Sequence, residues 1–361
     1  MRLVICGDMS VTEESAAAFE VANAKKAFDD ILEVFNAADR VIVNLECTLT
    51  ESEGEIKKFG PCLKAPLNTA LTLKRAGVTD CALSNNHIFD FGIKGLNDTI
   101  NSLEECELLY TGIGENYEDS RKNHIIEADG VSVAIINVCE HEYSYATENR
   151  IGTRPFDEFE TMQDIREAKK ANDYVIVIYH GGKERCRYPS PRLRKACREM
   201  VYCGADVVLC QHSHIIGCYE KFEDAHILYG QGNFHFIWSD MGEDWLEGLI
   251  VGLDIDKGKL DIDFIPVVVN GEGIELAKGE RKQKILSDMG KRNAELLSGE
   301  WKEHWVEFCK SNADIYKQAI CGYSIDDDED ATQWFSHYLE CEAHRDVWME
   351  LFPTWNKTNE I

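Results

Sequence analysis

The sequence predicts an α/β protein built around a buried sheet. From Arg2 to about Val269, short apolar runs alternate with amphipathic stretches, which is the pattern of strands joined by helices. Runs such as Tyr174–Tyr179 and Val207–Cys210 are apolar almost throughout, as expected for strands covered on both faces. After about Gly271 the β-branched runs stop, and stretches rich in Leu, Glu, Lys and Trp begin. We therefore expect an α/β domain over residues 1–270 and a helical C-terminal subdomain over residues 271–361, lying over or beside the functional site.

The individual elements follow from the same patterns. Strands are expected at Leu3–Cys6, Arg40–Leu45, Cys81–Leu83, Ser132–Val138, Tyr174–Tyr179, Asp206–Cys210, Ile227–Tyr229, Leu249–Ile255 and Leu260–Val269. One long helix is expected over Thr12–Ala38, with Thr12 as its N-cap, and further helices at Leu67–Ala76, Lys94–Glu105, Phe156–Ala171 and Pro191–Cys203. Gly77 and Gly204 occupy the positions that end two of these helices.

Charge and cysteine usage restrict the class of protein. Lys and Arg total 38 against 65 Asp and Glu, so the formal net charge is −27. Such a field repels nucleic acid and anionic membranes, and no apolar run approaches the roughly 18 residues of a membrane span. The 14 cysteines form no CxxC pair, and several lie in strand-like runs. This usage favours buried thiols in a reducing compartment, and the sequence start lacks a signal-type apolar segment, so we expect a cytoplasmic protein, or one from which a leader has already been removed.

Residues able to bind a metal end almost every strand of the first two thirds of the chain. Because the carboxyl ends of strands share one edge of an α/β sheet, we expect these segments to converge. Taken singly, each has a structural explanation as a helix cap, a turn residue or a core histidine. Together they would be costly to bury without a shared cation, and mixed oxygen and imidazole donors suit Mn, Fe or Zn ions. The residues are Asp8, Glu46, Asn86, His180, His212 and His214, with Glu46 as the candidate bridge between two cations.

The same strand ends carry a family resemblance. The blocks are Gly7-Asp8, Val43–Glu46, Ser84–Gly92, Thr111–Gly114, His180–Glu184, Gly204–His214 and Tyr229–Phe234. In this order they resemble the capsule-synthesis, CapA-like (PGA_cap) proteins, a branch of the calcineurin-like metallophosphatases. The resemblance covers about Arg2 to Val269, with a weaker likeness at Cys341–Arg345. It implies a metallophosphatase-like four-layer α/β/β/α sandwich.

The resemblance also implies roles for single residues. One cation would be held by Asp8, Glu46 and His214, and a second by Glu46, Asn86, His180 and His212. His87 would face the substrate as general acid or transition-state stabiliser, with Asp90 orienting it. The wider superfamily has histidine two residues after the first aspartate, where this chain has Ser10, so the first cation would be weakly held or absent. Ser213 stands where the family often has proline.

A basic run follows His180. Seven Lys and Arg residues fall between Lys183 and Arg198, with Glu184 as the only acid among them. This run is either an ordinary solvated helix face or a cationic rim that gathers an anionic substrate. For the second reading, the expected substrate-binding residues are Arg185 and Arg187, with Asn233 lining the same pocket.

Three functions remain open at this stage. The leading hypothesis is a metal-dependent hydrolase of the capsule-synthesis type that uses one or two divalent ions on a phosphoester or related bond. The family's link to poly-γ-glutamate implies an anionic polymer or small precursor as substrate. The alternative is a non-catalytic accessory protein that binds a polyanionic polymer, which Ser10 favours. A nucleic-acid phosphodiesterase is disfavoured by the net charge of −27.

Overall fold

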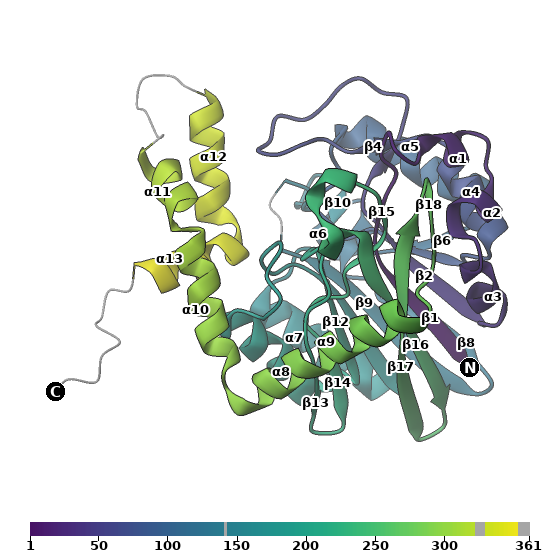
Figure 1. Cartoon of the computed structure of the whole chain (residues 1–361). Helices are drawn as coiled ribbons and strands as arrows, with labels where there is room; N and C mark the ends of the chain where they lie inside the picture. The colour runs from purple at the N-terminus through teal and green to yellow at the C-terminus, as the bar shows by residue number, and fades with distance from the viewer. Residues whose placement is uncertain (141–142, 322–328, 353–361) are drawn as a thin grey trace.

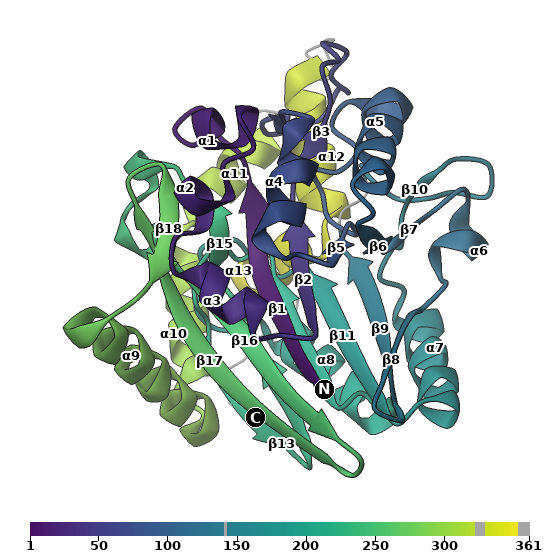
Figure 2. The same cartoon turned by 90° about the vertical axis from the view of Figure 1, so that its right-hand side faces the viewer.

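Two sheets packed face to face form the centre of the molecule (Figures 1 and 2). The computed structural model describes residues 1–140, 143–321 and 329–352. The first sheet has eight strands in the order β18-β17-β16-β1-β2-β5-β6, with β15 also pairing with β1. Its strands are β1 Arg2–Ser10, β2 Arg40–Leu45, β5 Asp80–Ala82, β6 Leu109–Thr111, β15 Asn233–Phe236, β16 Glu247–Asp256, β17 Lys259–Asn270 and β18 Gly273–Leu276.

The second sheet has six strands in the order β13-β14-β12-β11-β9-β8. Its strands are β8 His124–Ala128, β9 Val131–Cys139, β11 Tyr174–His180, β12 Val207–Gln211, β13 Tyr219–Phe222 and β14 Ala225–Leu228. Two small ribbons pair β3 Thr48–Leu49 with β4 Lys64–Ala65, and β7 Ile113–Gly114 with β10 Gly152–Thr153. The nine strands expected from the sequence are all present with small shifts at their ends.

Three apolar clusters separate the layers. In β1, Leu3 and Ile5 pack between the two sheets, whereas Val4 and Cys6 face the helices on the outer side. In β11, Ile176 points inward and Val177 outward in the same way. Because successive side chains of a strand alternate between faces, a strand that is apolar throughout must be covered on both. The expected four-layer α/β/β/α sandwich is confirmed.

Helices cover the outer face of each sheet. The first sheet is covered by α1 Ala16–Glu20, α2 Ala24–Phe28, α3 Ile31–Asn36, α4 Asn68–Ala76 and α5 Gly92–Glu105. On the side of the second sheet lie α6 Tyr117–Ser120, α7 Glu158–Ala171 and α8 Pro191–Cys203. Two short 3-10 turns, η1 Ser239–Met241 and η2 Glu243–Leu246, precede β16. Gly77 and Gly204 end α4 and α8 at φ values of 96° and 119°, which confirms them as helix-ending residues.

The expected single helix over Thr12–Ala38 is wrong. The segment forms three short helices, because polar residues interrupt it at each break. Asn23 caps α2 by accepting a hydrogen bond from the Lys26 backbone N–H, and Asp29 adopts a positive φ of 32° after α2. Thr12 is not the N-cap either, since its hydroxyl donates to the Ile237 carbonyl across 2.6 Å.

The C-terminal part of the chain is helical, as expected. It comprises α9 Gly279–Ser298, α10 Trp301–Ser311, α11 Ala313–Cys321, α12 Glu329–Glu340 and α13 Glu342–Leu351. Figures 1 and 2 both place α12 at the level of the carboxyl ends of β1 and β2. Within the described ranges, none of the helices combines the length and apolarity that a membrane crossing would require. None of the 13 cysteines whose side chains the structure describes takes part in a disulfide.

Candidate metal centre

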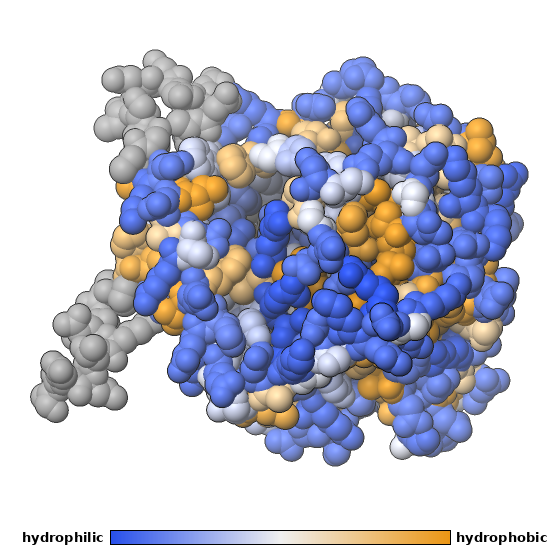
Figure 3. Space-filling model, viewed as in Figure 1, coloured by the Kyte–Doolittle hydropathy of each residue, from blue (hydrophilic) through white to orange (hydrophobic). Residues whose placement is uncertain are grey.

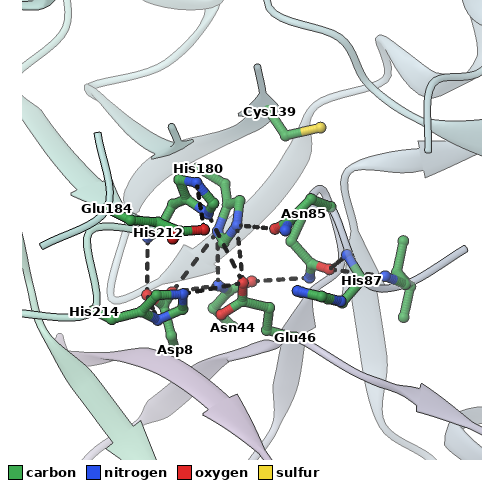
Figure 4. Close-up of polar contacts among 12 residues, drawn as sticks. Asp8, Asn44, Glu46, Asn85, His87, Cys139, His180, Glu184, His212 and His214 are labelled. Carbon is green, nitrogen blue, oxygen red and sulfur yellow. Dashed lines mark hydrogen bonds and ion pairs between the residues drawn. The ribbon is translucent and has the colours of Figure 1, made fainter. Parts of the chain in front are cut away.

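Side chains from five strand ends converge on one point between the sheets (Figure 4). Asp8 lies near the end of β1, Glu46 directly follows β2, and His180 is the last residue of β11. Their ligand atoms, and separately those of Glu46, His212 and His214, lie within 4.8 Å of one another. The structure thus brings together the carboxylates and imidazoles that the sequence singled out, and leaves each of them at most 4% exposed.

Glu46 lies at the centre of this cluster. Its Oε1 is 3.3 Å from His180 Nε2, 3.9 Å from His214 Nε2 and 4.0 Å from His212 Nδ1. The side chain is fully buried, and neither carboxylate oxygen has a hydrogen-bond partner among the residues described. Burial raises the pKa of Glu46. A buried carboxylate without a donor is costly unless a cation compensates it, so this donor set fits a divalent metal ion.

Asp8 is held beside Glu46 by side chains and backbone from two segments, β2 and the residues after β12. Asn44 Nδ2 donates to Oδ1 across 2.7 Å, and the backbone N–H of His212 donates to Oδ2 across 2.8 Å. His214 Nδ1 lies 3.4 Å from Oδ2. Burial, together with the Glu46 carboxylate, raises the pKa of Asp8 to about 6. Two carboxyls that each resist ionisation would both become better acids with a cation between them.

The two histidines after β12 adopt an unusual backbone. His212 has φ 81° and His214 has φ 58°, both in the left-handed region that non-glycine residues rarely occupy. The conformation brings both rings to Glu46, with the ring centroids 5.6 Å apart. For His214, burial opposes the charged form, but the Glu46 and Asp8 carboxylates prevail and raise its pKa. Strain of this kind persists where a site requires it.

His180 connects the carboxylates to Asn86. Its Nε2 lies 2.7 Å from Asn86 Oδ1, while its Nδ1 lies 3.1 Å from Asn44 Nδ2. Burial lowers the pKa of His180 to about 4, so its ring is neutral at pH 7, as a metal ligand must be. Asn86 is therefore close enough to join the candidate ligands.

Two asparagines that the sequence reading passed over hold this arrangement. Asn85 Nδ2 donates to Asn44 Oδ1 across 3.2 Å, and Asn85 Oδ1 accepts from the backbone N–H groups of His87 and Ile88. Asn44 in turn contacts Asp8 and His180. Asn44 lies in the block Val43–Glu46 and Asn85 in the block Ser84–Gly92, both of which carry the family resemblance. Their place in these blocks was the feature of the sequence that could have indicated a role at the site.

His87 and Asp90 form a pair with Lys58. His87 Nδ1 lies 2.6 Å from Asp90 Oδ2, and Lys58 Nζ donates to Asp90 Oδ1 and lies 3.2 Å from His87 Nδ1. Asp90 also accepts from the Leu63 backbone N–H across 2.7 Å. Burial, and then the Lys58 charge, lowers the pKa of His87. Asp90 thus fixes one ring nitrogen of His87, as expected from the spacing, and Lys58 is a further partner that the sequence did not reveal.

A cavity of about 200 Å³ opens onto this centre. Asn86, His87 and His212 line it from the sandwich, with the loop around Lys58 and with Lys183 and Glu184. Glu184 Oε1 lies 3.7 Å from His212 Nε2. Residues of the C-terminal helices line the cavity as well: His337, Tyr338, Cys341, Ala343 and His344.

The three expected substrate-binding residues do not line this cavity among the residues described. Arg185 Nη2 donates to the Met241 carbonyl across 2.9 Å, and Arg187 forms an ion pair with Asp244. Asn233 is 3% exposed, and its Oδ1 lies 3.0 Å from His214 Nδ1. Asn233 therefore positions a candidate ligand, and both arginines hold the η1–η2 segment.

Three further arginines of the basic run lie neither on a solvated face nor at a rim, whereas Lys195 is exposed to solvent. Arg194 and Arg198 both bind the carboxylate of Glu220. Arg192 bridges Glu140, which follows β9, and Asp346 on α13. The charges of these three arginines are neutralised by ion pairs within the protein. Lys183 differs, because it forms no ion pair with any described residue and lines the cavity.

A family model extends over most of the sandwich. The family described as "Bacterial capsule synthesis protein PGA_cap" matches residues 2–237. The Capsule biosynthesis protein CapA of Bacillus anthracis is 34% identical over 215 residues, which are 57% of this chain and 51% of that protein. The PGA biosynthesis protein CapA of Bacillus subtilis (strain 168) is 28% identical over 239 residues, 64% of this chain and 62% of that protein. This chain thus spans about half to three fifths of these two relatives.

A third relative extends further along the chain. The "Probable polyglutamine synthesis accessory protein Rv0574c" of Mycobacterium tuberculosis (strain H37Rv) is 28% identical over 287 residues, 75% of this chain and 72% of that protein. Among solved structures, a hypothetical protein from Thermus thermophilus has 17% identity and a TM-score of 0.48, covering 74% of this chain and 98% of that one. A dimetal phosphatase from Danio rerio has 8% identity and a TM-score of 0.37, and the match covers 62% of this chain and 94% of that one.

Proposed function

Because this chain belongs to the bacterial capsule synthesis protein family, we propose that it is a metal-dependent hydrolase acting on a phosphoester or related bond of an anionic substrate. The observation that carries the proposal is the Glu46 carboxylate, fully buried among three imidazoles and without a hydrogen-bond donor among the residues described. The relatives' names concern capsule and PGA biosynthesis, which supports a polyanionic polymer or its precursor as substrate.

Two candidate ligand sets share Glu46. Following the family resemblance, Asp8, Glu46 and His214 would hold one cation, and Glu46 with Asn86, His180 and His212 a second. By distance alone, the structure groups Asp8 and Glu46 with His180, and Glu46 with His212 and His214. Divalent Mn, Fe or Zn at these positions would make water a nucleophile near neutral pH and stabilise charge on the reacting oxygens. The chemistry of the donor set supports such ions over a thiolate-bound structural zinc, because no cysteine contributes.

His87 is the proposed proton donor. Asp90 contacts its Nδ1, which leaves Nε2 to serve the cavity that the ring lines. The ring lies at the cavity and outside both candidate ligand sets, which is the position from which a side chain can protonate a departing oxygen. Asn44 and Asn233 act through the residues they contact and serve as positioning residues.

A non-catalytic accessory role is the second candidate. Ser10 stands where the wider superfamily has a histidine ligand, and one relative is named as an accessory protein of polyglutamine synthesis. With a hydroxyl there, the first cation would be weakly held. The protein would then bind a polyanion at the metal rim and hydrolyse nothing.

Metal content combined with turnover separates the two functions. Protein purified without added metal would be analysed by elemental mass spectrometry and assayed with aryl phosphate monoester and diester probes. Two metal equivalents with turnover support the hydrolase; one or none without turnover supports the accessory role. Glu46→Gln should lose metal while remaining folded, whereas Glu13→Gln, at an exposed position, should keep it.

A further inference from the structure

Two C-terminal helices contribute to the cavity over the candidate metal centre. His337 and Tyr338 on α12, and His344 on α13, share the lining with His87 and His212. These helices lie beyond residues 2–237, which the family model covers. Figure 3 shows both hydrophilic and hydrophobic residues where the helical segment meets the sandwich. The pocket of this chain is therefore completed by a segment that the family match does not include.

The His344 ring is fixed in place. Tyr316 Oη lies 2.7 Å from His344 Nδ1, and the Tyr338 ring stacks on His344 with centroids 3.9 Å apart. His344 is only 6% exposed. A ring restrained by a hydrogen bond and a stacking contact presents a defined edge, as recognition of a ligand requires.

The loop that carries Lys58 packs against α12. Phe59 stacks on His337 at 5.4 Å and on Trp334 at 6.0 Å between centroids. Its backbone N–H donates to Tyr143 Oη across 3.2 Å. These contacts join the rim of the sandwich to the helices, so the cavity is walled by both parts of the chain.

Charge and size restrict what this cavity can hold. Lys183 lines it together with the Glu184 carboxylate, whose pKa its charge helps to lower against the effect of burial, and forms no ion pair with any described residue. A cation kept available in such surroundings favours an anionic ligand. The volume of about 200 Å³ lies below the roughly 300–1,000 Å³ typical of pockets for drug-sized ligands. A phosphoryl or carboxylate end fits these limits better than an internal segment of a polymer.

We propose that α12 and α13 close the substrate pocket so that it accepts a small or terminal anionic group, with Lys183 and His344 as its contacts. This rests on the function proposed above, because it names the substrate class of the same site. Tyr316 acts through His344 and is a positioning residue. The site would work from the end of an anionic chain, or on a small ester, and would not cut within a polymer.

Binding of inorganic phosphate to metal-loaded protein tests the two contacts without needing turnover. In calorimetric titrations, Lys183→Ala and His344→Gln should each raise the Kd for phosphate at least about tenfold. Lys195→Ala, at an exposed position of α8, is the matched control and should stay within about twofold. Tyr316→Phe should raise Kd less than His344→Gln does. Unchanged phosphate affinity in both contact variants, with wild-type melting temperature and metal content, would overturn the assignment.

Two substrates of different size test whether α12 and α13 limit the size of the group that the pocket accepts. Wild-type enzyme should prefer p-nitrophenyl phosphate to bis(p-nitrophenyl) phosphate, and His337→Ala should lower that ratio of kcat/KM at least about fivefold by widening the pocket. A ratio unchanged by His337→Ala would overturn the size selection. Absence of turnover of both probes by metal-loaded wild type would contradict the hydrolase function instead, and phosphate binding alone would then decide the role of Lys183 and His344.

Discussion

The guanidinium of Arg192 joins α8 to α13, with its Nε 3.1 Å from Asp346 Oδ1 and its Nη2 on the carboxylate of Glu140. Glu140 is 2% exposed, and its Oε2 also accepts from the Gly182 backbone N–H across 2.7 Å. Gly182 directly precedes Lys183. One buried ion network thus connects a C-terminal helix to the loop that follows the candidate ligand His180.

Arg192→Met should destabilise the protein strongly, because it leaves the Glu140 carboxylate buried without its cation. We expect a loss of roughly 3–5 kcal/mol in the free energy of unfolding, measured in urea. Arg166→Met is the matched control on α7, where both partners of a 3.9 Å pair with Glu199 are half exposed, and it should change stability by less than about 1 kcal/mol. Equal losses in the two variants would contradict the role of the network.

His87→Ala should lower kcat about 10²–10⁴-fold while leaving metal content unchanged, because His87 contacts Asp90 and lines the cavity outside the two candidate ligand sets. Glu46→Gln should instead lose metal first. Elemental analysis alongside steady-state kinetics distinguishes the two. Equal loss of metal in both variants would show that the roles are misassigned.

Glu220 should make stability depend on acid pH. It is buried, and hydrogen bonds from Arg198, Arg194 and Tyr229 outweigh that burial and lower its pKa to about 2. A carboxyl whose pKa is depressed by folding contributes stability above its unfolded pKa of about 4.3 and loses it as pH falls toward 2. Glu220→Gln should therefore be less stable than wild type by about 2 kcal/mol at pH 7, with the difference shrinking below pH 4. Denaturant unfolding at several pH values would measure this, and a difference independent of pH would contradict it.

Two glycines should respond in opposite ways to alanine. A Cβ at Gly181 would lie 2.3 Å from Glu140 Oε2, so Gly181→Ala should displace that carboxylate and lower stability by about 1–3 kcal/mol. A Cβ at Gly290, on an exposed position of α9, meets nothing within 4 Å, and Gly290→Ala should raise stability by about 0.5–1 kcal/mol. Thermal melts check both. A neutral Gly181→Ala would show that Glu140 can move without cost.

Arg187→Glu should change KM little, by less than about twofold, because Arg187 pairs with Asp244 outside the cavity. Lys183→Glu should raise KM at least about tenfold, since the reversed charge would face an anionic substrate. Steady-state kinetics at two ionic strengths would compare them. A larger effect at Arg187 would restore the sequence-based assignment of Arg185 and Arg187 to substrate binding.

The layers and the convergence of strand ends were predictable because each depends on local pattern. An apolar strand such as Tyr174–Tyr179 must be covered on both faces, and His180 must then lie at the shared edge. The segment Thr12–Ala38 divides into three helices because Asn23 caps α2 and because the chain turns at Asp29. Its apolar residues keep helical spacing across both points, so the spacing alone predicts one continuous helix. Local pattern specifies which face is buried more reliably than where a helix stops.

Pairings between distant segments could not be read from the chain. Arg192 lies more than 50 residues after Glu140 and more than 150 residues before Asp346. A basic run in the sequence does not indicate which distant carboxylates neutralise it. The same holds for His337 and His344, which have no ligand spacing and acquire a role only by packing over the cavity. The position of these histidines depends on tertiary contacts of α12 and α13. Tertiary contacts also determine that Lys183 forms no ion pair with a described residue.

The two walls of the cavity are made at different times on the ribosome. Asp8, Glu46, His180, His212 and His214 all precede residue 215, whereas His337 and His344 emerge more than 120 residues later. Protein segments fold in order from the amino end during synthesis. The nascent chain can therefore gather the candidate cation ligands before α12 and α13 are made to cover them. Under the function proposed above, this order of synthesis would let the chain acquire its metal ions before the pocket that selects the substrate is complete.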